Sequence, residues 1–130
     1  MTAPLPVGPP GPAAAPLPRR VLVIEDDPDV LDLLESHLHR LGWVVDRAES
    51  GEQGVSQALA APPAVVLVDL MLPGMDGRAV IRALRASRRT AACRLIVTSV
   101  LDPDEHGVEA DGVLGKPFTA RDVRRAVGVA

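Results

Sequence analysis

Short apolar runs alternate along the chain with segments whose apolar residues recur at helical spacing. Five runs rich in Val, Leu and Ile are typical of strands: residues 19–25, 43–49, 64–70, 93–100 and a short one within 111–117. Residues 65–68, VVLV, are apolar on both faces of such a strand, as expected where helices cover a sheet on two sides. The pattern therefore predicts a mainly buried five-stranded sheet.

The intervening segments carry helix signals. Four polar residues are expected to cap helices at their N-termini: Asp27, Ser50, Asp76 and Thr119. The residues expected to face the core from three of these helices are Val30, Leu31, Leu34, Leu38 and Leu41, then Val80, Ile81 and Leu84, then Val123 and Val127. The helix after Ser50 is expected to reach about Ala60. Strands and helices that alternate in this way indicate an α/β fold with a parallel sheet between two helical layers.

Composition limits the chain to one ordinary domain. Residues 1–18 have no charged side chain and contain seven prolines, which predicts a flexible Pro/Ala-rich arm ahead of a domain at 19–130. No signal peptide or long apolar run is present, so no membrane insertion is expected. The net charge of −3 gives no general attraction to nucleic acid, and the lone Cys93 fits a reducing cytoplasm.

Polar residues gather where the expected strands end. Glu25 and Asp26 are at the end of the first strand, Asp69 ends the third, Thr98 lies near the end of the fourth, and Lys116 follows the fifth. In the common strand order 2-1-3-4-5, the first and third strands are neighbours at the point where the winding reverses. The carboxylates, the hydroxyl and the ammonium group are therefore expected to converge in one cleft.

This combination of groups suits phosphoryl transfer. Clustered carboxylates favour Mg²⁺, which takes one or two of them together with water and phosphate oxygens. Asp69 would serve as the nucleophile, since aspartyl phosphate is an established covalent intermediate. Lys116 would balance the charge of the transferred group, and the Thr98 hydroxyl would donate to one of its oxygens. Positioning and electrostatics supply most of the catalysis in such reactions.

Four motifs in order, VLVIEDD, VVLVDLMLPGMDG, LIVTS and GKPF, resemble the receiver (CheY-like) domain of bacterial two-component response regulators over about residues 19–130. The resemblance implies a flavodoxin-like three-layer, doubly wound sandwich with a five-stranded parallel sheet and five helices. It implies that Asp69 is the phosphoacceptor and that Glu25, Asp26, Asp69 and the Met71 backbone carbonyl hold Mg²⁺. Thr98 and Lys116 would be the switch hydroxyl and the phosphate-binding lysine, and the bond to Pro117 would be cis.

The sequence departs from the family in three places. The position three residues before the lysine usually carries the switch aromatic and here is Val113. The interval from Thr98 to Lys116 is shorter than usual, and residues 101–112 include a proline and two glycines, so the fourth helix is expected to be short or missing. The chain also ends at about the fifth helix, without an output domain, so output by protein–protein contact is expected.

The preferred hypothesis is a phospho-accepting module of a two-component system or phosphorelay. It would not be an enzyme in its own right, but a phosphoacceptor that assists its own phosphotransfer and dephosphorylation. Its expected partners are a histidine kinase or phosphotransfer protein and an unknown effector, and it would be a monomer or weak dimer. The arginines at 78, 82, 85 and 89 fall on one helical stripe and are expected to form a solvated face.

Three other functions share parts of this pattern. A pseudo-receiver would use the same fold as a phosphorylation-independent interaction module, and the missing aromatic keeps that possibility open. A haloacid dehalogenase-type enzyme needs a second aspartate two residues after the nucleophile, where this chain has Met71. A flavodoxin-like flavin binder needs a hydroxyl-rich phosphate loop after the first strand, and EDDPD at 25–29 would repel a phosphate.

Overall fold

The computed structural model describes residues 19–100 and 110–128. Five strands and four helices alternate in this part of the chain: β1 (Arg20–Ile24), α1 (Pro28–Arg40), β2 (Val44–Ala48), α2 (Gly51–Ala60), β3 (Val65–Asp69), α3 (Gly77–Ala86), β4 (Arg94–Ser99), β5 (Gly112–Gly115) and α4 (Ala120–Val127). The helix labelled α4 is the one expected last in the sequence. Two expectations, the arm at 1–18 and most of the segment thought to lack a helix, fall outside the described residues.

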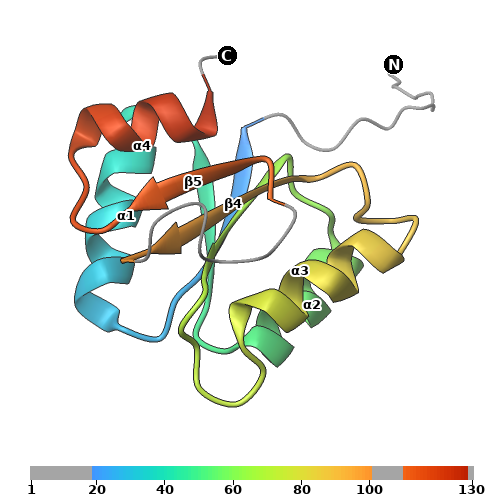
Figure 1. Ribbon diagram of the computed structural model, residues 1–130. Coiled ribbons are helices and arrows are strands. Elements are labelled where there is room, and N and C mark those ends of the chain that lie inside the picture. Colours follow the sequence, from blue (N-terminus) through green and yellow to red (C-terminus); the bar gives the residue numbers. More distant parts are fainter. Residues whose placement is uncertain (1–18, 101–109, 129–130) are drawn as a thin grey trace, which may run out of the picture.

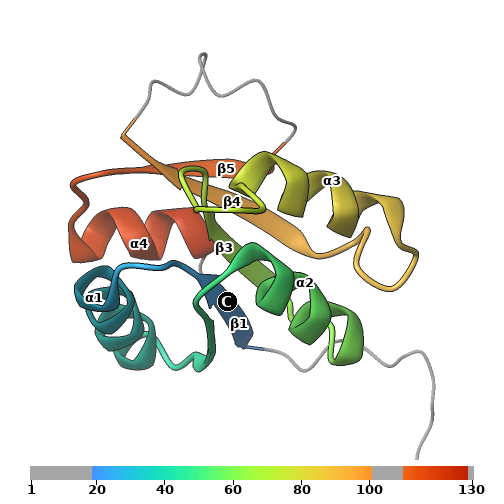
Figure 2. The same ribbon diagram turned by 90° about the horizontal axis from the view of Figure 1, so that it is seen from below.

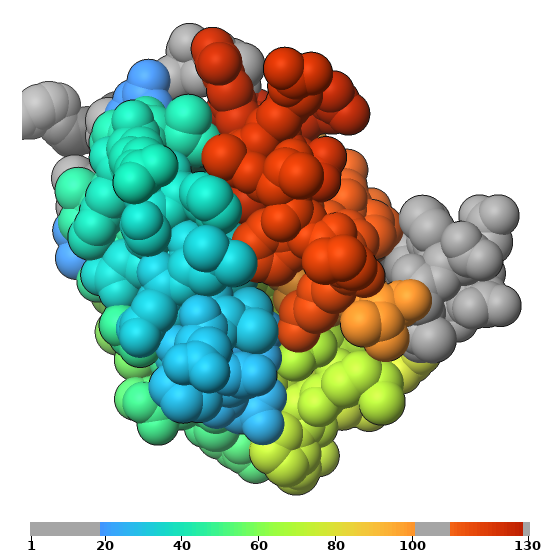
Figure 3. All heavy atoms as spheres, turned by 90° about the vertical axis from the view of Figure 1, so that its left-hand side faces the viewer, coloured from blue at the N-terminus to red at the C-terminus, as the bar shows by residue number. Residues whose placement is uncertain are grey.

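The five strands form one parallel sheet in the order β2-β1-β3-β4-β5, which confirms the expected fold class. Helices α1 and α4 cover one face of the sheet, and α2 and α3 cover the other (Figures 1 and 2). Seen from outside, α1 and α4 lie side by side on their face of the molecule (Figure 3). In this order β1 and β3 are central neighbours, so residues at their carboxyl ends lie close together.

Alternate residues of the central strands supply two separate cores. Leu22, Ile24, Val66 and Val68 pack with the buried faces of α2 and α3, which include Ala58, Val80, Ile81 and Leu84. Val21, Val23, Val65 and Leu67 pack with the residues that α1 and α4 bury: Leu31, Leu34, Leu38, Val123 and Val127. Every residue of β3 is buried. Fully burying a Val or Leu side chain contributes about 1.5–3 kcal/mol, so these two cores hold the strand ends in place.

The four expected N-terminal caps are present. Asp27, Ser50, Asp76 and Thr119 each accept a hydrogen bond from a backbone N–H of the first helical turn. Thr119 and Asp122 form a complete capping box. At Ser50 the box is incomplete, because the Gln53 side chain accepts its hydrogen bond from the N–H of Glu49 (2.8 Å), one residue before Ser50. The local polar pattern thus identifies the helix starts correctly.

Gly77, the first residue of α3, fits closely against the end of β3. A Cβ atom at this position would collide with the carbonyl oxygen of Asp69 and with the Cα atom of Leu70. The N–H of Gly77 also donates to the carbonyl oxygen of Leu70 (3.2 Å). The absence of a side chain at Gly77 therefore allows the start of α3 to pack directly on the backbone that carries Asp69.

The helices are those of a compact α/β domain. None of the helices in the described ranges 19–100 and 110–128 is long and apolar enough to cross a lipid bilayer.

Candidate functional site

The polar residues expected at the strand ends do come together. Glu25 and Asp26 follow β1, Asp69 is the last residue of β3, and Thr98 lies beside Asp69 in the register of β3 and β4. Lys116 follows β5, and its backbone N–H donates to the carbonyl oxygen of Ser99 at the end of β4 (2.8 Å). All of them occupy the carboxyl edge of the sheet, where open α/β sheets bind ligands.

The Lys116 ammonium group lies between two carboxylates. Its Nζ atom is 3.0 Å from Oε1 of Glu25 and 3.4 Å from Oδ2 of Asp69. Both acidic side chains are almost completely buried, at 2% and 7% exposed, and the lysine side chain is 20% exposed. A buried carboxylate needs a cation or hydrogen-bond donors, and Lys116 supplies one charge for two such groups.

Burial also changes the protonation of these groups. Burial has the largest effect on Glu25 and raises its pKa; the hydrogen bond from Lys116 opposes this, the charge of Asp69 adds to it, and the result is a pKa of about 6 instead of 4.5. For Lys116, burial favours a lower pKa, but the hydrogen bond to Glu25 and the charges of Asp69 and Glu25 outweigh it and raise the pKa. The site therefore retains the lysine as a cation and has more negative charge than it can balance.

Backbone N–H groups orient the two buried carboxylates. The N–H of Met71 donates to Oδ1 of Asp69 (3.0 Å), and the N–H of Asp27 donates to Oε2 of Glu25 (3.2 Å). Each carboxylate thus has one oxygen bound by the loop that follows its own strand and the other facing Lys116. Met71 is 64% exposed, and the role that the resemblance implies for it concerns only its backbone carbonyl.

Glu25, Asp26 and Asp69 form a group that fits a hard divalent cation. One carboxylate oxygen from each lies within 4.8 Å of the others, and Asp26 is the exposed member of the group. Oxygen ligands, two buried carboxylates and one open side match the way proteins bind Mg²⁺, which keeps several waters. Because the three carboxylates lie close together and Lys116 pairs with two of them, a cation would also relieve their mutual repulsion.

The hydroxyl of Thr98 is the unusual polar group at this edge. Thr98 is 1% exposed, and its buried Oγ1 atom has no hydrogen-bond partner among residues 19–100 and 110–128. Buried hydroxyl groups almost always have a partner, so an unsatisfied one requires an explanation. Its position on β4, directly beside Asp69, leaves the hydroxyl able to donate to a group attached to the aspartate.

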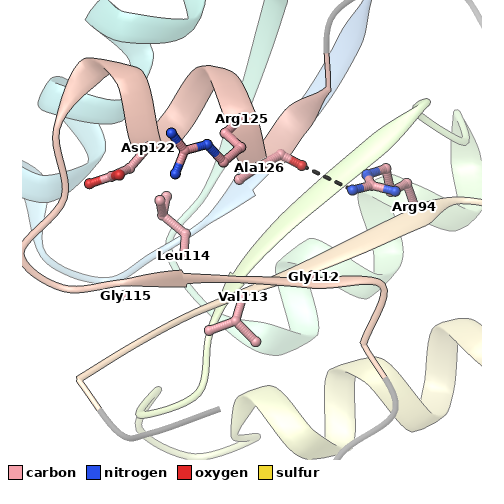
Figure 4. A pocket seen from close by; sticks show the side chains of 8 residues that line it. All are labelled: Arg94, Gly112, Val113, Leu114, Gly115, Asp122, Arg125 and Ala126. Carbon is pink, nitrogen blue, oxygen red and sulfur yellow. Dashed lines mark hydrogen bonds between the residues drawn. The ribbon is translucent and has the colours of Figure 1, made fainter.

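Two further expectations concern β5 and the residues just after it. The Lys116–Pro117 peptide bond is cis, as expected. Val113 is half-buried on β5, and its side chain points away from α4, whereas the next residue, Leu114, points toward α4 (Figure 4). Leu114 and Arg125 are among the residues that line a pocket of about 280 Å³ between β5 and α4. The site thus has the expected lysine and cis proline, with a valine where the resemblance suggested an aromatic side chain.

The expected solvated face of the arginines at 78, 82, 85 and 89 is found for Arg82 and Arg89, which are exposed, whereas Arg85 is half-buried. The Arg85 guanidinium donates to the carbonyl oxygens of Ala91 and Cys93 (3.1 and 3.3 Å) and forms an ion pair with Asp111 (3.0 Å). Arg89 donates to the carbonyl oxygen of Leu59 (2.6 Å). Helical spacing shows which side chains share a face, but it does not reveal backbone carbonyls that a neighbouring loop places within reach.

Comparisons with known proteins agree with this geometry. The family model "Response regulator receiver domain" matches residues 21–128, nearly all of the part that contains the sheet and the cleft. The chain belongs to the response regulator receiver family. As a receiver, it carries an acidic residue, a hydroxyl and a lysine at the positions that the resemblance assigned to phosphoryl chemistry.

Relatives of this receiver include bacterial transcriptional regulators. It is 33% identical over 109 residues to the DNA-binding dual master transcriptional regulator RpaA of Synechocystis, a match that covers 80% of this chain and 45% of RpaA. It is 35% identical over 103 residues to the protein PilH of Pseudomonas aeruginosa, a match that covers 79% of this chain and 81% of PilH. The chain spans less than half the length of RpaA and most of the length of PilH.

Solved structures share the fold. A putative response regulator from Chloroflexus aurantiacus matches with a TM-score of 0.74 at 30% identity, over 82% of this chain and 91% of that one. The receiver domain of a sensor histidine kinase from Pseudomonas aeruginosa matches with a TM-score of 0.76 at 27% identity, over 85% and 98% of the two chains. That domain was solved with a magnesium ion coordinated in its active-site cleft.

Proposed function

We propose that this receiver accepts a phosphoryl group on Asp69 in a Mg²⁺-dependent reaction and signals through contacts with other proteins. The observation that carries the proposal is the position of the Asp69 carboxylate, which lies 3.4 Å from the Lys116 ammonium and shares an acidic cluster with Glu25 and Asp26. A nucleophile, a fixed cation and a set of oxygen ligands therefore occupy one edge of the sheet.

Glu25, Asp26 and Asp69 would hold the divalent cation, with the backbone carbonyl of Met71 as the further ligand that the family resemblance implies. Once bound, Mg²⁺ would neutralise charge on the phosphoryl oxygens. The protein provides the ligands on two neighbouring strands, β1 and β3, and the backbone hydrogen bonds to Glu25 and Asp69 fix their orientation before any ligand arrives. Such preorganisation lowers the cost of forming the transition state.

In the transfer step, an oxygen of the Asp69 carboxylate attacks phosphorus. A new oxygen–phosphorus bond forms, and the phosphorus–nitrogen bond to the donor histidine breaks, leaving the electron pair on the imidazole, which takes a proton from solvent. Lys116 already faces Asp69, and its ammonium group would move its hydrogen bonds from the carboxylates to the phosphoryl oxygens. The buried Thr98 hydroxyl would gain its missing partner by donating to another phosphoryl oxygen.

The same residues would assist hydrolysis of the phosphoryl group, so the chain acts on its own modification and not on an external substrate. The donor would be a histidine kinase or a phosphotransfer protein, by analogy with the family. Met71 and Val100 follow β3 and β4 at the carboxyl edge and are 64% and 70% exposed, which gives a partner protein apolar surface near the cleft. An effector protein would read the phosphorylated state, and a cytoplasmic location stays a prediction.

The pseudo-receiver alternative gains no support from the site. A module that never used phosphate would have no need for a buried carboxylate pair around a lysine, since such groups are costly to bury. Here Glu25 and Asp69 are both buried against Lys116. The valine at position 113 affects the conformational change that would follow phosphorylation. It does not affect whether Asp69 can be phosphorylated.

Beryllofluoride, which mimics a phosphoryl group on aspartate, tests the proposal without a kinase. Fluorine NMR of the protein with Mg²⁺ and beryllofluoride should show bound fluoride signals that disappear when Mg²⁺ is removed. The variant Asp69→Asn should lose them, whereas the control Asp32→Asn, which changes an exposed carboxylate on α1, should keep them. Bound signals that persist in Asp69→Asn would refute the assignment of the phosphoacceptor.

A further inference from the structure

Strand β5 has few side chains that fix its place in the sheet. It is the shortest of the described strands, with four residues, and it lies at the sheet edge with β4 as its one neighbour. Two of the four are glycines, and Leu114 is the buried residue of the strand. Because the pairing register of a strand depends on which side chains are buried, β5 is weakly specified by its own sequence.

The guanidinium of Arg85, in the last turn of α3, reaches the start of this strand. Its Nη1 atom donates to the carbonyl oxygens of Ala91 and Cys93, in the segment that leads into β4. Its Nη2 atom donates to Oδ2 of Asp111 at 3.0 Å. One planar group therefore connects α3, the entry to β4 and the residue immediately before β5, a task for which the rigid fork of arginine is well suited.

Asp111 completes the connection to β4. Its backbone N–H donates to the carbonyl oxygen of Leu95 (2.7 Å), and its Oδ2 atom accepts from the N–H of Leu95 (2.8 Å). Burial favours a higher pKa for Asp111, but the hydrogen bonds from Leu95 and Arg85 outweigh it and lower the pKa, so the carboxylate is ionised at neutral pH. The adjacent Arg94 instead donates to the carbonyl oxygen of Ala126 and connects β4 to α4 (Figure 4).

Lys116 lies at the other end of the same strand, five positions after Asp111. A slip of β5 by one residue would move Lys116 by about 3.3 Å and turn its side chain to the other face of the sheet. Contacts of 3.0 and 3.4 Å to Glu25 and Asp69 could not survive such a shift. We propose that Arg85 and Asp111 form a positioning pair that fixes the register of β5 and thereby holds Lys116 beside Asp69.

The catalytic meaning of this positioning pair rests on the proposed function, in which Lys116 acts on the phosphoryl group. Neither Arg85 nor Asp111 would touch that group, since both lie at the amino end of β4 and β5, opposite the cleft. The pair would act through the strand alone. Loss of the pair should therefore affect Lys116 strongly and the cores around α1 and α2 only slightly.

Lys116 is the only lysine in the sequence, which makes a direct test possible. With ¹³C-labelled lysine, NMR of the metal-free protein gives one side-chain ε-methylene signal, and that signal reports the surroundings of Lys116. In Arg85→Gln and Asp111→Asn the signal should move toward the position of free lysine, and amide hydrogen exchange over 112–116 should become faster. Arg82→Gln, which changes an exposed arginine on the same helix, should leave both unchanged.

Asp111→Asn keeps an oxygen acceptor for the N–H of Leu95 and is therefore the milder variant. If the Lys116 signal and the exchange of 112–116 stayed as in the wild type in both variants, the positioning role would be refuted. Exchange that became faster equally in α1 would refute it too, because it would show a general loss of stability.

A second measurement addresses the chemistry. The initial rate of phosphorylation by acetyl phosphate with Mg²⁺ should fall by between about tenfold and a hundredfold in Arg85→Gln, since misplacing a catalytic group by an ångström can cost that much. Arg82→Gln should react at the wild-type rate. If the wild-type protein were not phosphorylated at all, the proposed function would fail, and the lysine signal would still decide whether the pair positions Lys116.

Discussion

Replacing Thr98 by valine should stabilise the resting protein, although it removes a polar group from the site. Thr98 is 1% exposed, and its hydroxyl has no hydrogen-bond partner in the part of the chain that the structure describes, so folding takes this group out of water without compensation from those residues. Valine has nearly the same shape and the same preference for strands, and it leaves the packing of β4 intact. The substitution therefore measures what the hydroxyl group alone contributes to stability.

The size of the effect follows from the cost of an unsatisfied buried hydroxyl. Mutational data place that cost at about 1–3 kcal/mol. The free energy of unfolding of Thr98→Val should accordingly rise by about 1–2 kcal/mol. For a domain of this size, each kcal/mol corresponds to roughly 4 °C or more in Tm.

Thr90 offers a matched control with the opposite expected sign. Its side chain is fully buried, and its hydroxyl donates to the carbonyl oxygen of Leu84 at 2.6 Å. Thr90→Val removes the donor of that hydrogen bond, so the carbonyl oxygen of Leu84 near the end of α3 loses it. The loss should destabilise the protein by about 1–2 kcal/mol. Two identical substitutions at buried threonines should thus move stability in opposite directions.

Urea unfolding of the metal-free protein, followed by the fluorescence of the single Trp43, would measure both variants. With Mg²⁺ and beryllofluoride added, Thr98→Val should gain less stability than the wild type, because it lacks the hydroxyl that would bind the phosphoryl mimic. If Thr98→Val were as destabilising as Thr90→Val, the Thr98 hydroxyl would have a partner in the resting state. The reasoning about its role would then be refuted.

Three further outcomes are expected. Mg²⁺ at a hundredfold excess over its dissociation constant should stabilise the protein by about 2.7 kcal/mol, and a melting curve insensitive to millimolar Mg²⁺ would contradict the metal site. Folding raises the pKa of Glu25 from 4.5 to about 6, so between these pH values the folded protein binds a proton that the unfolded chain has released. The free energy of unfolding of the metal-free protein should therefore fall by up to about 2 kcal/mol as the pH rises from 4.5 to 6. Glu25→Gln should lack that part of the pH dependence. Beryllofluoride should slow hydrogen exchange over residues 71–77 and 99–111, because Val113 has no ring to move. Strong new protection across 113–127 would show that the usual switch operates without its aromatic.

Much of this fold could be predicted because its signals are local. Helix caps such as Asp27 and Asp76 are identified by a polar residue just before a periodic segment, and both were found where expected. The site could be predicted for a topological reason. In a parallel sheet the carboxyl ends of neighbouring strands meet, so Asp69 and Thr98 had to lie side by side once the strand order was known.

The contacts of Arg85 could not be predicted in the same way. Its partners include the carbonyl oxygens of Ala91 and Cys93, which every residue type carries and which leave no trace in the sequence. Its charged partner, Asp111, is 26 positions away in the chain, beyond the reach of helical or strand periodicity. The sequence also does not show which of the two neighbouring acidic residues is buried. Glu25 is buried and Asp26 is exposed because of the path that the loop after β1 takes.

The most direct test of the central claim is to map the phosphoryl group after incubation of the intact protein with acetyl phosphate and Mg²⁺. Mass spectrometry should find one added phosphoryl group, removable by hydroxylamine, in the peptide that contains Asp69, and none when Mg²⁺ is omitted. The variant Asp69→Ala should remain unmodified. A stable adduct on a serine, threonine or histidine, or equal labelling of Asp69→Ala, would contradict the account.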